Sequence, residues 1–187
     1  MASTSDFRNG LCIEHNNDIF TIVEFQHVKP GKGAAFVRTK LKSLSTGRVL
    51  ENTFTAGHKV VTARIERRKY QFLYKDDMGY NFMHTETYEQ IALDEKLVSN
   101  PGLLKEGANV EMMYHAEKEL VLSCELPASV VMTVTYTEPG VKGDTATNTF
   151  KPATIDTGAT INVPLFVNEG DKIKINTSDN SYIERVK

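Results

Sequence analysis

The sequence predicts an all-β protein built from small barrels. Short runs rich in Val, Ile, Thr, Tyr and Phe follow one another along the 187 residues, and most of them alternate between apolar and polar side chains. Turn-forming residues (Gly, Pro, Asn and Asp) separate these runs throughout the chain. The charge distribution further divides the chain into three blocks, which we take as candidate domains: 1–64, 65–127 and 128–187.

The first block begins with a predicted hairpin. Two β-rich runs, "LCIE" and "IFTIVEF", flank His15-Asn16-Asn17-Asp18, four residues that tolerate turn geometry. The segment "HVKPGKGAAF" follows, in which Lys32 stands between Gly31 and Gly33. Pro30 fixes its own φ, and glycine can adopt backbone angles that are closed to other residues, so we expect a tight loop here.

The strand predicted after this loop alternates clearly in "AAFVRTKLKSL". Val37, Thr39 and Leu41 fall on one face, which we expect to enter a core. The other face carries an aromatic ring and three cations: Phe36, Arg38, Lys40 and Lys42. The turn "STGR" then leads the chain back into "VLENTF".

The second block repeats the pattern of strands and turns. "RRKYQFLYKDDMGYNFMH" predicts two strands joined by a turn at 75–79. "YEQIALDEKLVSN" has helical spacing in its apolar residues, and we expect one short helical turn there, ended by Asn100-Pro101-Gly102; these apolar residues are Ile91, Leu93, Leu97 and Val98. "ANVEMMYHAEKELVLSCEL" predicts two further strands around 116–118.

The third block contains the remaining strands. We place its boundary at Pro127, because proline cannot donate a hydrogen bond within a central strand. "SVVMTVTYTEP" is an alternating β-branched strand, and a polar loop rich in Gly and Thr is expected at 140–150. "ATIDTGATINVPLFV" and "DKIKINTSDNSYIERV" predict the last strands, with turns at 157–158 and 168–170.

Charge is distributed unevenly, although the net charge is only −2. The first block holds nine basic and five acidic side chains, the second seven and twelve, and the third six and seven. Residues 25–50 contain six cations and no acidic residue, and three of these cations alternate along one predicted strand. A basic patch on an otherwise acidic molecule suggests oriented docking on a polyanion, whereas a solvated strand face is the alternative.

The composition is that of a globular protein, with 40% hydrophobic and 25% charged residues. No apolar run approaches membrane-spanning length, and the start "MASTSDFRNG" lacks the basic and apolar regions of a signal peptide. Cys12 and Cys124 are far apart and suit reduced thiols better than a disulfide framework. We therefore expect a cytoplasmic protein with no membrane partner.

The sequence offers no motif for metal binding or covalent catalysis. Its five histidines and two cysteines lack zinc-ligand spacing, so we expect no metal and no cofactor. "PGKGAAF" differs from a phosphate-binding P-loop, which needs G-x-x-x-x-G-K-[ST] before a helix, because here the loop leads into a strand. Acidic residues such as Asp76 and Asp77 lie in a predicted turn, and nothing selects a catalytic pair. We expect no catalytic residue and no enzyme activity.

Lys32 has three interpretations at this point. It could be an ordinary turn residue, because a lone G-K-G is frequent. It could be a catalytic amine, but such an amine needs burial or a cationic neighbour, and a protruding tip supplies neither. It could also be a projecting cation that enters a narrow anionic site. Composition alone leaves the first and third interpretations open.

Longer motifs carry a resemblance across essentially the whole chain. "FQHVKPGKGAAFVRTKLKSLSTGRV", "MHTETYEQI" and "TGATINVPLFVNEGDKIKINTSDNSYIERVK" occur in the order typical of the elongation factor P family, with "PGLLKEG" and "EPGVKGDTAT" between the last two. The chain closely resembles this family. The resemblance implies an SH3-like (KOW-like) barrel followed by two oligonucleotide-binding-type (OB-fold) barrels, in an L-shaped, tRNA-like arrangement.

The resemblance also implies a function in translation. Family members bind the 70S ribosome between the P and E sites, position peptidyl-tRNA, stimulate peptide-bond formation and relieve stalling at consecutive prolines. The expected partners are therefore the ribosome, its rRNA and peptidyl-tRNA. A lysine-modifying enzyme is a further expected partner, because the family's tip residue is enlarged by modification in many relatives.

Specific residues follow from the match to the family's motifs. Lys32 matches the tip residue that reaches the acceptor end of peptidyl-tRNA, and the residues that shape its loop are Lys29, Pro30, Gly31 and Gly33. The strand cations Arg38, Lys40 and Lys42 either contact rRNA or tRNA backbones or solvate a strand. The loop expected to approach the E-site codon on the small subunit comprises Gly143, Asp144, Thr145, Ala146 and Thr147. Tyr182 and Arg185 match the terminal motif, and core packing accounts for the tyrosine equally well.

Two other functional classes remain as alternatives. A general single-stranded RNA-binding protein of OB-fold barrels would need exposed aromatic residues among its cations. Phe36 is a weak instance of this pattern, and the acidic second block disfavours it. An enzyme is the third class, and no motif supports it.

Overall fold

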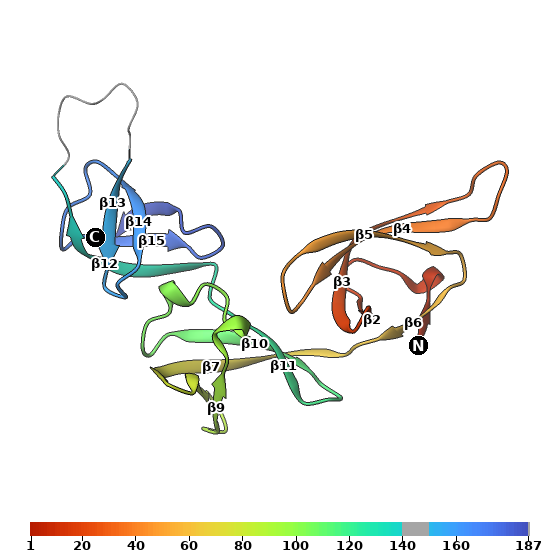
Figure 1. Ribbon diagram of the computed structural model, residues 1–187, viewed down its shortest axis with the longest axis horizontal. Coiled ribbons are helices and arrows are strands. Elements are labelled where there is room, and N and C mark those ends of the chain that lie inside the picture. Colours follow the sequence, from red (N-terminus) through yellow and green to blue (C-terminus); the bar gives the residue numbers. More distant parts are fainter. Residues whose placement is uncertain (140–149, 187) are drawn as a thin grey trace. The chain divides into compact units, whose positions relative to one another are not determined.

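A computed structural model describes residues 1–139 and 150–186, and these residues form three antiparallel β-sheets (Figure 1). This confirms the predicted all-β class. The helical segments of this part are single 3-10 turns, and none of its helices has the length and apolar character needed to cross a membrane. The predicted loop at 140–150 lies outside the described residues, apart from Phe150.

The first sheet has six strands in the order β1-β6-β2-β3-β4-β5. A 3-10 turn, η1 (Thr4–Asp6), follows its first strand. Its strands are β1 (Ala2–Ser3), β2 (Cys12–His15), β3 (Asp18–Val28), β4 (Phe36–Ser43), β5 (Val49–Thr55) and β6 (Lys59–Thr62).

The predicted hairpin at 15–18 is present and joins β2 to β3. Asn16 and Asn17 have φ angles of 47° and 62°. Positive φ at both central residues of a two-residue turn suits the right-handed twist of the flanking strands, and asparagine tolerates it well. The sequence therefore fixes the pairing of Glu14 with Ile19 across β2 and β3.

Strands β3 and β4 form the longest hairpin of this sheet, drawn in orange in Figure 1. Their pairing extends from Phe20 opposite Ser43 to Val28 opposite Phe36, and it shifts between Ile22 and Glu24. This irregularity is a β-bulge, in which one strand carries an extra residue. The hairpin thus continues past the bulge toward the loop that contains Lys32.

The alternation predicted for β4 is confirmed. Val37 and Leu41 are fully buried and Thr39 is 3% exposed, with its hydroxyl donating to the Asn52 carbonyl at 2.8 Å. The core of this sheet consists of apolar side chains from both ends of the block: Phe7, Ile13, Phe20, Ile22, Val37, Leu41, Phe54 and Val60. Because alternate residues of β4 enter this core, the remaining ones are held on the outer face.

The second sheet has the order β11-β10-β7-β8-β9. Its strands are β7 (Ile65–Asp76), β8 (Gly79–His84), β9 (Gln90–Leu93), β10 (Asn109–His115) and β11 (Leu120–Glu125). The predicted turns at 75–79 and 116–118 join β7 to β8 and β10 to β11, respectively. A positive φ at Glu119 closes the second of these turns.

The helical spacing around residue 91 produces less helix than its length suggests. Ile91 and Leu93 belong to strand β9, which pairs with β8, and only η2 (Glu95–Leu97) is helical. Asp94 caps this turn by accepting a hydrogen bond from the Lys96 amide at 2.9 Å. A second 3-10 turn, η3 (Pro101–Leu103), follows. The expected single helical turn is therefore present, but half of the apolar residues that suggested it lie in a strand.

The third sheet has the order β14-β13-β12-β15-β16. Its strands are β12 (Ser129–Thr137), β13 (Phe150–Ile155), β14 (Thr160–Pro164), β15 (Lys172–Asn176) and β16 (Tyr182–Val186). Its core includes Leu103 from η3 together with alternate residues of the strands. The turns predicted at 157–158 and 168–170 lie between these strands.

The chain divides into two compact units. The first contains Met1–Arg68 and Met112–Ser123, and the second contains Lys69–Glu111 and Cys124–Lys187. The turn between β10 and β11 thus belongs to the same unit as the first sheet. The domain boundaries drawn from the sequence at residues 64 and 127 stay predictions.

Candidate functional site

The candidate site is the loop between β3 and β4, together with the outer face of β4. Pro30 supplies a fixed φ but no amide donor, so the loop cannot continue the strand pairing. Gly33 has a φ of +117°, a backbone conformation that residues with a side chain rarely adopt. Gly31 does not have such an angle, and a Cβ atom there would meet no heavy atom within 4 Å. Only Gly33 is therefore required by the backbone.

Lys32 lies at the exposed tip of this loop. It makes no hydrogen bond or ion pair with any residue in the described part of the chain, and its neighbours from Lys29 to Ala34 are exposed as well. A lysine nucleophile is ordinarily activated by desolvation or by a second cation. An exposed ammonium group on a four-carbon stem suits another task, which is to reach an anionic group on a partner.

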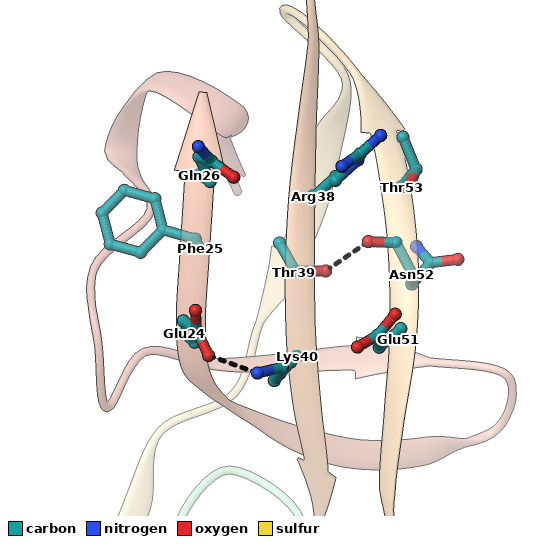
Figure 2. Close-up of a pocket in the computed structure, with 9 residues that line it drawn as sticks. All are labelled: Glu24, Phe25, Gln26, Arg38, Thr39, Lys40, Glu51, Asn52 and Thr53. Atoms are coloured by element: carbon teal, nitrogen blue, oxygen red, sulfur yellow. Dashed lines mark hydrogen bonds and ion pairs between the residues drawn. The ribbon is translucent and has the colours of Figure 1, made fainter. Parts of the chain in front are cut away.

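The outer face of β4 is arranged in cross-strand rows. Arg38 lies between Gln26 of β3 and Thr53 of β5, and Lys40 lies between Glu24 and Glu51 of the same strands (Figure 2). A depression of about 280 Å³ opens along these rows. It is lined by Glu24, Phe25, Gln26, Arg38, Thr39, Lys40, Glu51, Asn52 and Thr53.

Lys40 has partners within the protein. Its Nζ donates to Glu24 Oε2 at 2.6 Å. The hydrogen bond and charge of Glu24, together with the charge of Glu51, raise the pKa of Lys40. The row as a whole carries two carboxylates and one ammonium group, so its net charge is negative.

Arg38 and Lys42 lack carboxylate partners among the described residues. The Arg38 guanidinium lies over the Phe36 ring, 5.6 Å from its centroid. Such cation–π contacts hold the guanidinium plane without neutralising its charge. Lys42 is exposed and lies between Thr21 and Val49. The free cations of β4 are therefore at its two ends, with the compensated Lys40 between them.

The structure brings most of the predicted site residues onto one hairpin. Lys29, Pro30, Gly31, Lys32 and Gly33 share the loop, and the three cations follow on β4. The second predicted loop, at Gly143, Asp144, Thr145, Ala146 and Thr147, lies outside the described residues.

The two residues of the terminal motif differ in environment. Tyr182 packs against the core of the third sheet, as the structural interpretation expected. Arg185 lies over the exposed ring of Phe166 at 5.8 Å and forms an ion pair with Asp171 at 3.5 Å.

Sequence reasoning missed the two acids that flank Lys40. Glu24 and Glu51 lie 16 and 11 residues away from Lys40 in the sequence, and only the register of β3, β4 and β5 brings them together. The pairing of β4 with β5 follows from the tight "STGR" turn and could have suggested Glu51. The bulge in β3 conceals Glu24, because it changes which residues of β3 face outward.

The described residues show no cluster that suits a metal ion or a reactive thiol. No group of three or more His, Cys, Asp or Glu side chains is placed to hold a metal within the described ranges. Cys12 and Cys124 are free thiols. Burial raises the pKa of the Cys124 thiol to about 12, which disfavours its reactive thiolate form.

Family models match three segments of the chain. An elongation factor P KOW-like domain matches residues 3–60, an elongation factor P OB domain matches residues 65–122, and an elongation factor P C-terminal domain matches residues 130–185. Among curated proteins, elongation factor P of Flavobacterium psychrophilum is 63% identical over 187 residues, which is all of both chains. Elongation factor P 1 of Porphyromonas gingivalis is 60% identical, again over all of both chains.

Solved structures support the fold at lower identity. The translation initiation factor 5A structure from Methanococcus jannaschii has a TM-score of 0.51 and 22% identity, covering 67% of this chain and 90% of that one. An initiation factor 5A family protein from Naegleria fowleri has a TM-score of 0.53 and 17% identity, covering 67% and 96% of the two chains. These structures show the fold alone, and the family models and the full-length relatives show that the chain belongs to the elongation factor P family.

Proposed function

We propose that this protein is a translation elongation factor that binds the 70S ribosome between the P and E sites. There it positions peptidyl-tRNA, stimulates peptide-bond formation and relieves stalling at consecutive prolines. Its partners are rRNA and peptidyl-tRNA, and its place of action is the cytoplasm, where ribosomes translate. Membership of the elongation factor P family supports the assignment to translation.

One observation carries the finer proposal. Lys32 lies at the exposed end of a two-stranded arm, without an intramolecular partner among the described residues, while Gly33 holds the loop in a conformation closed to other residues. An arm of this kind delivers a cation to a distant anionic site. The acceptor end of a tRNA is such a site, because its backbone phosphates are negatively charged.

Positioning alone is a sufficient mechanism. Proline is an awkward nucleophile, and a peptidyl ester held in an unsuitable geometry reacts slowly with it. Correct orientation of reactants can contribute up to about 7–11 kcal/mol in favourable cases. Lys32 would therefore act by steadying the acceptor end, and no side chain of this protein needs to enter the bond-making step. A modifying enzyme that lengthens Lys32 would extend the same contact.

A general single-stranded RNA-binding protein is the alternative. Such proteins stack successive bases on exposed aromatic rings between cations. On β4 the aromatic residue is Phe36, which is partly buried and already covered by Arg38. Lys40 is compensated by Glu24. This face favours a few backbone contacts over an extended stacking platform.

The test replaces the tip lysine. We expect Lys32→Ala to abolish the relief of a polyproline stall in a reconstituted translation assay while its melting temperature stays unchanged, because Lys32 has no structural contact among the described residues. Lys59→Ala, which removes another exposed lysine of the same sheet, is the control and should behave as the unmodified sequence.

Two outcomes would contradict the proposal. Normal stall relief by Lys32→Ala would exclude the positioning role of the tip. The affinity for stalled ribosomes is measured by ribosome pelleting, and the affinity for free single-stranded RNA by titration. Equal affinities for the two would favour the alternative function.

A further inference from the structure

The turn between β10 and β11 packs on the side of the first sheet. Ile19 and Ala63 from the first sheet and its exit form a small cluster with Met113 and Leu122. All four are buried, and the cluster is separate from the main core of that sheet. Burial of this apolar surface stabilises the attachment of the hairpin.

Charged groups surround this apolar contact. Glu14 Oε1 accepts a hydrogen bond from Lys118 Nζ at 2.6 Å, and His115 Nε2 lies 3.4 Å from the same oxygen. The hydrogen bond from Lys118 is the main cause that lowers the pKa of Glu14. The Ala116 amide also donates to the Arg64 carbonyl at 2.9 Å. The turn is thus fixed by side chains and by the backbone.

A second ion pair holds the far side of the same turn. Arg68 donates to both oxygens of Glu119, at 2.8 and 3.1 Å, and to Glu66 at 3.0 Å. Its guanidinium lies 4.2 Å from the centroid of the Tyr114 ring. Such a two-pronged contact fixes orientation as well as distance.

These contacts connect directly to the strand that carries the lysine loop. Glu14 of β2 pairs with Ile19 of β3, and Ile19 belongs to the same buried cluster as Met113 and Leu122 of the hairpin. β3 extends from Asp18 to Val28, with its bulge between Ile22 and Glu24, and the loop of Lys32 follows it. The hairpin of β10 and β11 therefore packs at the Ile19 end of β3, and the loop that contains Lys32 follows the other end of this strand.

We propose that the turn between β10 and β11 positions Lys32 by fixing the base of β3, and that Lys118 is a positioning residue for stall relief. This inference rests on the proposed function. It assigns a role to the second block that the sequence motifs did not suggest, since Lys118 lies 86 positions beyond the lysine that it serves. The geometry that carries it is the hydrogen bond from Lys118 to Glu14, together with the buried cluster that Ile19 shares with Met113 and Leu122 of the hairpin.

The functional test compares four variants in the stall-relief assay. We expect Lys118→Glu to lower the maximal rate of relief about tenfold at saturating protein, since small displacements of a positioned group cost rate steeply, and Lys118→Ala to lower it less, because it only removes an exposed ion pair. The concentration that gives half of the effect should change by less than about twofold, because the surfaces that bind the ribosome are retained. Lys118→Arg should keep the native rate. Lys174→Ala, which breaks an exposed ion pair to Glu184 in the third sheet, is the matched control.

A structural readout separates positioning from other roles of Lys118. Residual dipolar couplings should show that the amides of β3 and those of residues 112–123 share one alignment tensor in the native protein. We expect two tensors in Lys118→Glu, in which two carboxylates would face each other.

Several results would overturn the inference. A native maximal rate in Lys118→Glu would do so, and so would a reduced rate with a single shared tensor, because Lys118 would then act on the ribosome directly. Two tensors in the native protein would show that the hairpin is not attached. Lys32→Ala is measured in parallel: if that variant is active, the proposed function itself fails, whereas the couplings still decide whether the hairpin holds β3.

Discussion

Gly33 offers a sharp test of whether the shape of the lysine loop matters. Its φ of +117° lies in a region that alanine adopts only with strain. A Cβ atom added at Gly33 would meet Pro30 Cγ at 3.8 Å, an ordinary contact, so steric overlap contributes nothing. The whole cost of Gly33→Ala is therefore the backbone conformation.

The size of this cost follows from the backbone angle. A residue held in a sparsely populated φ/ψ region costs about 1–3 kcal/mol. Because every 1.4 kcal/mol is a factor of ten, the native loop conformation loses about 5- to 150-fold against relaxed alternatives. The loop is exposed and can relax without disturbing the sheet, so the melting temperature should hardly change. The apparent affinity for the ribosome is the intrinsic affinity multiplied by the fraction of protein whose loop keeps the native conformation.

The assay is a titration of stall relief against protein concentration. We expect Gly33→Ala to need at least about fivefold more protein for half of the maximal effect. Gly31→Ala is the control, because its backbone angle is ordinary and a Cβ atom there meets open space. Equal titration curves for the two variants would refute the reasoning, since the loop conformation would then have no bearing on function.

Three further predictions concern the strands, the charges and the pH. Gly79→Ala should lower the free energy of unfolding by about 3 kcal/mol or more, because Gly79 has a positive φ and the new Cβ would overlap the Leu93 carbonyl oxygen. A denaturant titration measures this loss, and a value below about 1 kcal/mol would contradict the prediction. Lys42→Gln should reduce the slope of log affinity for ribosomes against log salt concentration by about one. Lys40→Gln should leave this slope nearly unchanged, because Lys40 is already paired with Glu24. Equal slopes in both variants would show that Lys42 is only a solvated residue of the strand and does not contact a phosphate. Folding lowers the pKa of Glu14, so the contribution of this carboxylate to stability is present above its ordinary pKa of 4.5 and is lost as the pH falls below that value. The melting temperatures of the native protein and of Glu14→Gln should therefore converge in acid. A difference that stays constant with pH would show that the ion pair of Glu14 does not stabilise the protein.

The sequence was most informative where local chemistry decides the structure. The turn at Asn16 and Asn17 and the alternation of β4 follow from residue type and spacing alone, and both are confirmed. Leu93 was misleading, because an apolar residue at helical spacing from Leu97 also suits an edge strand of a small sheet. Short apolar runs do not distinguish these structures, and pairing with β8 decides between them.

Long-range contacts could not be predicted from the sequence, for a different reason. Nothing in the residues around Lys118 indicates that Glu14, more than one hundred positions earlier, is its partner. The pairing of Lys40 with Glu24 depends on a bulge whose position the alternation of polar and apolar residues does not reveal. Lys32, in contrast, could be chosen as a candidate because of the glycines and the proline beside it and because of the resemblance to a family, and its role stays a prediction.

The bulge in β3 also constrains how the lysine arm can change in evolution. Ile22 faces the core before the bulge and Glu24 faces outward after it, so the two halves of the hairpin are out of phase by one residue. Val23 is the extra residue, so its deletion would only remove the bulge: Glu24 would still lie opposite Lys40 and Phe25 opposite Thr39, and the faces of the distal half would be unchanged. A single insertion or deletion in β3 beyond the bulge would instead exchange the inner and outer faces, so the reach of the arm can be changed only by adding or removing residues in pairs on both strands.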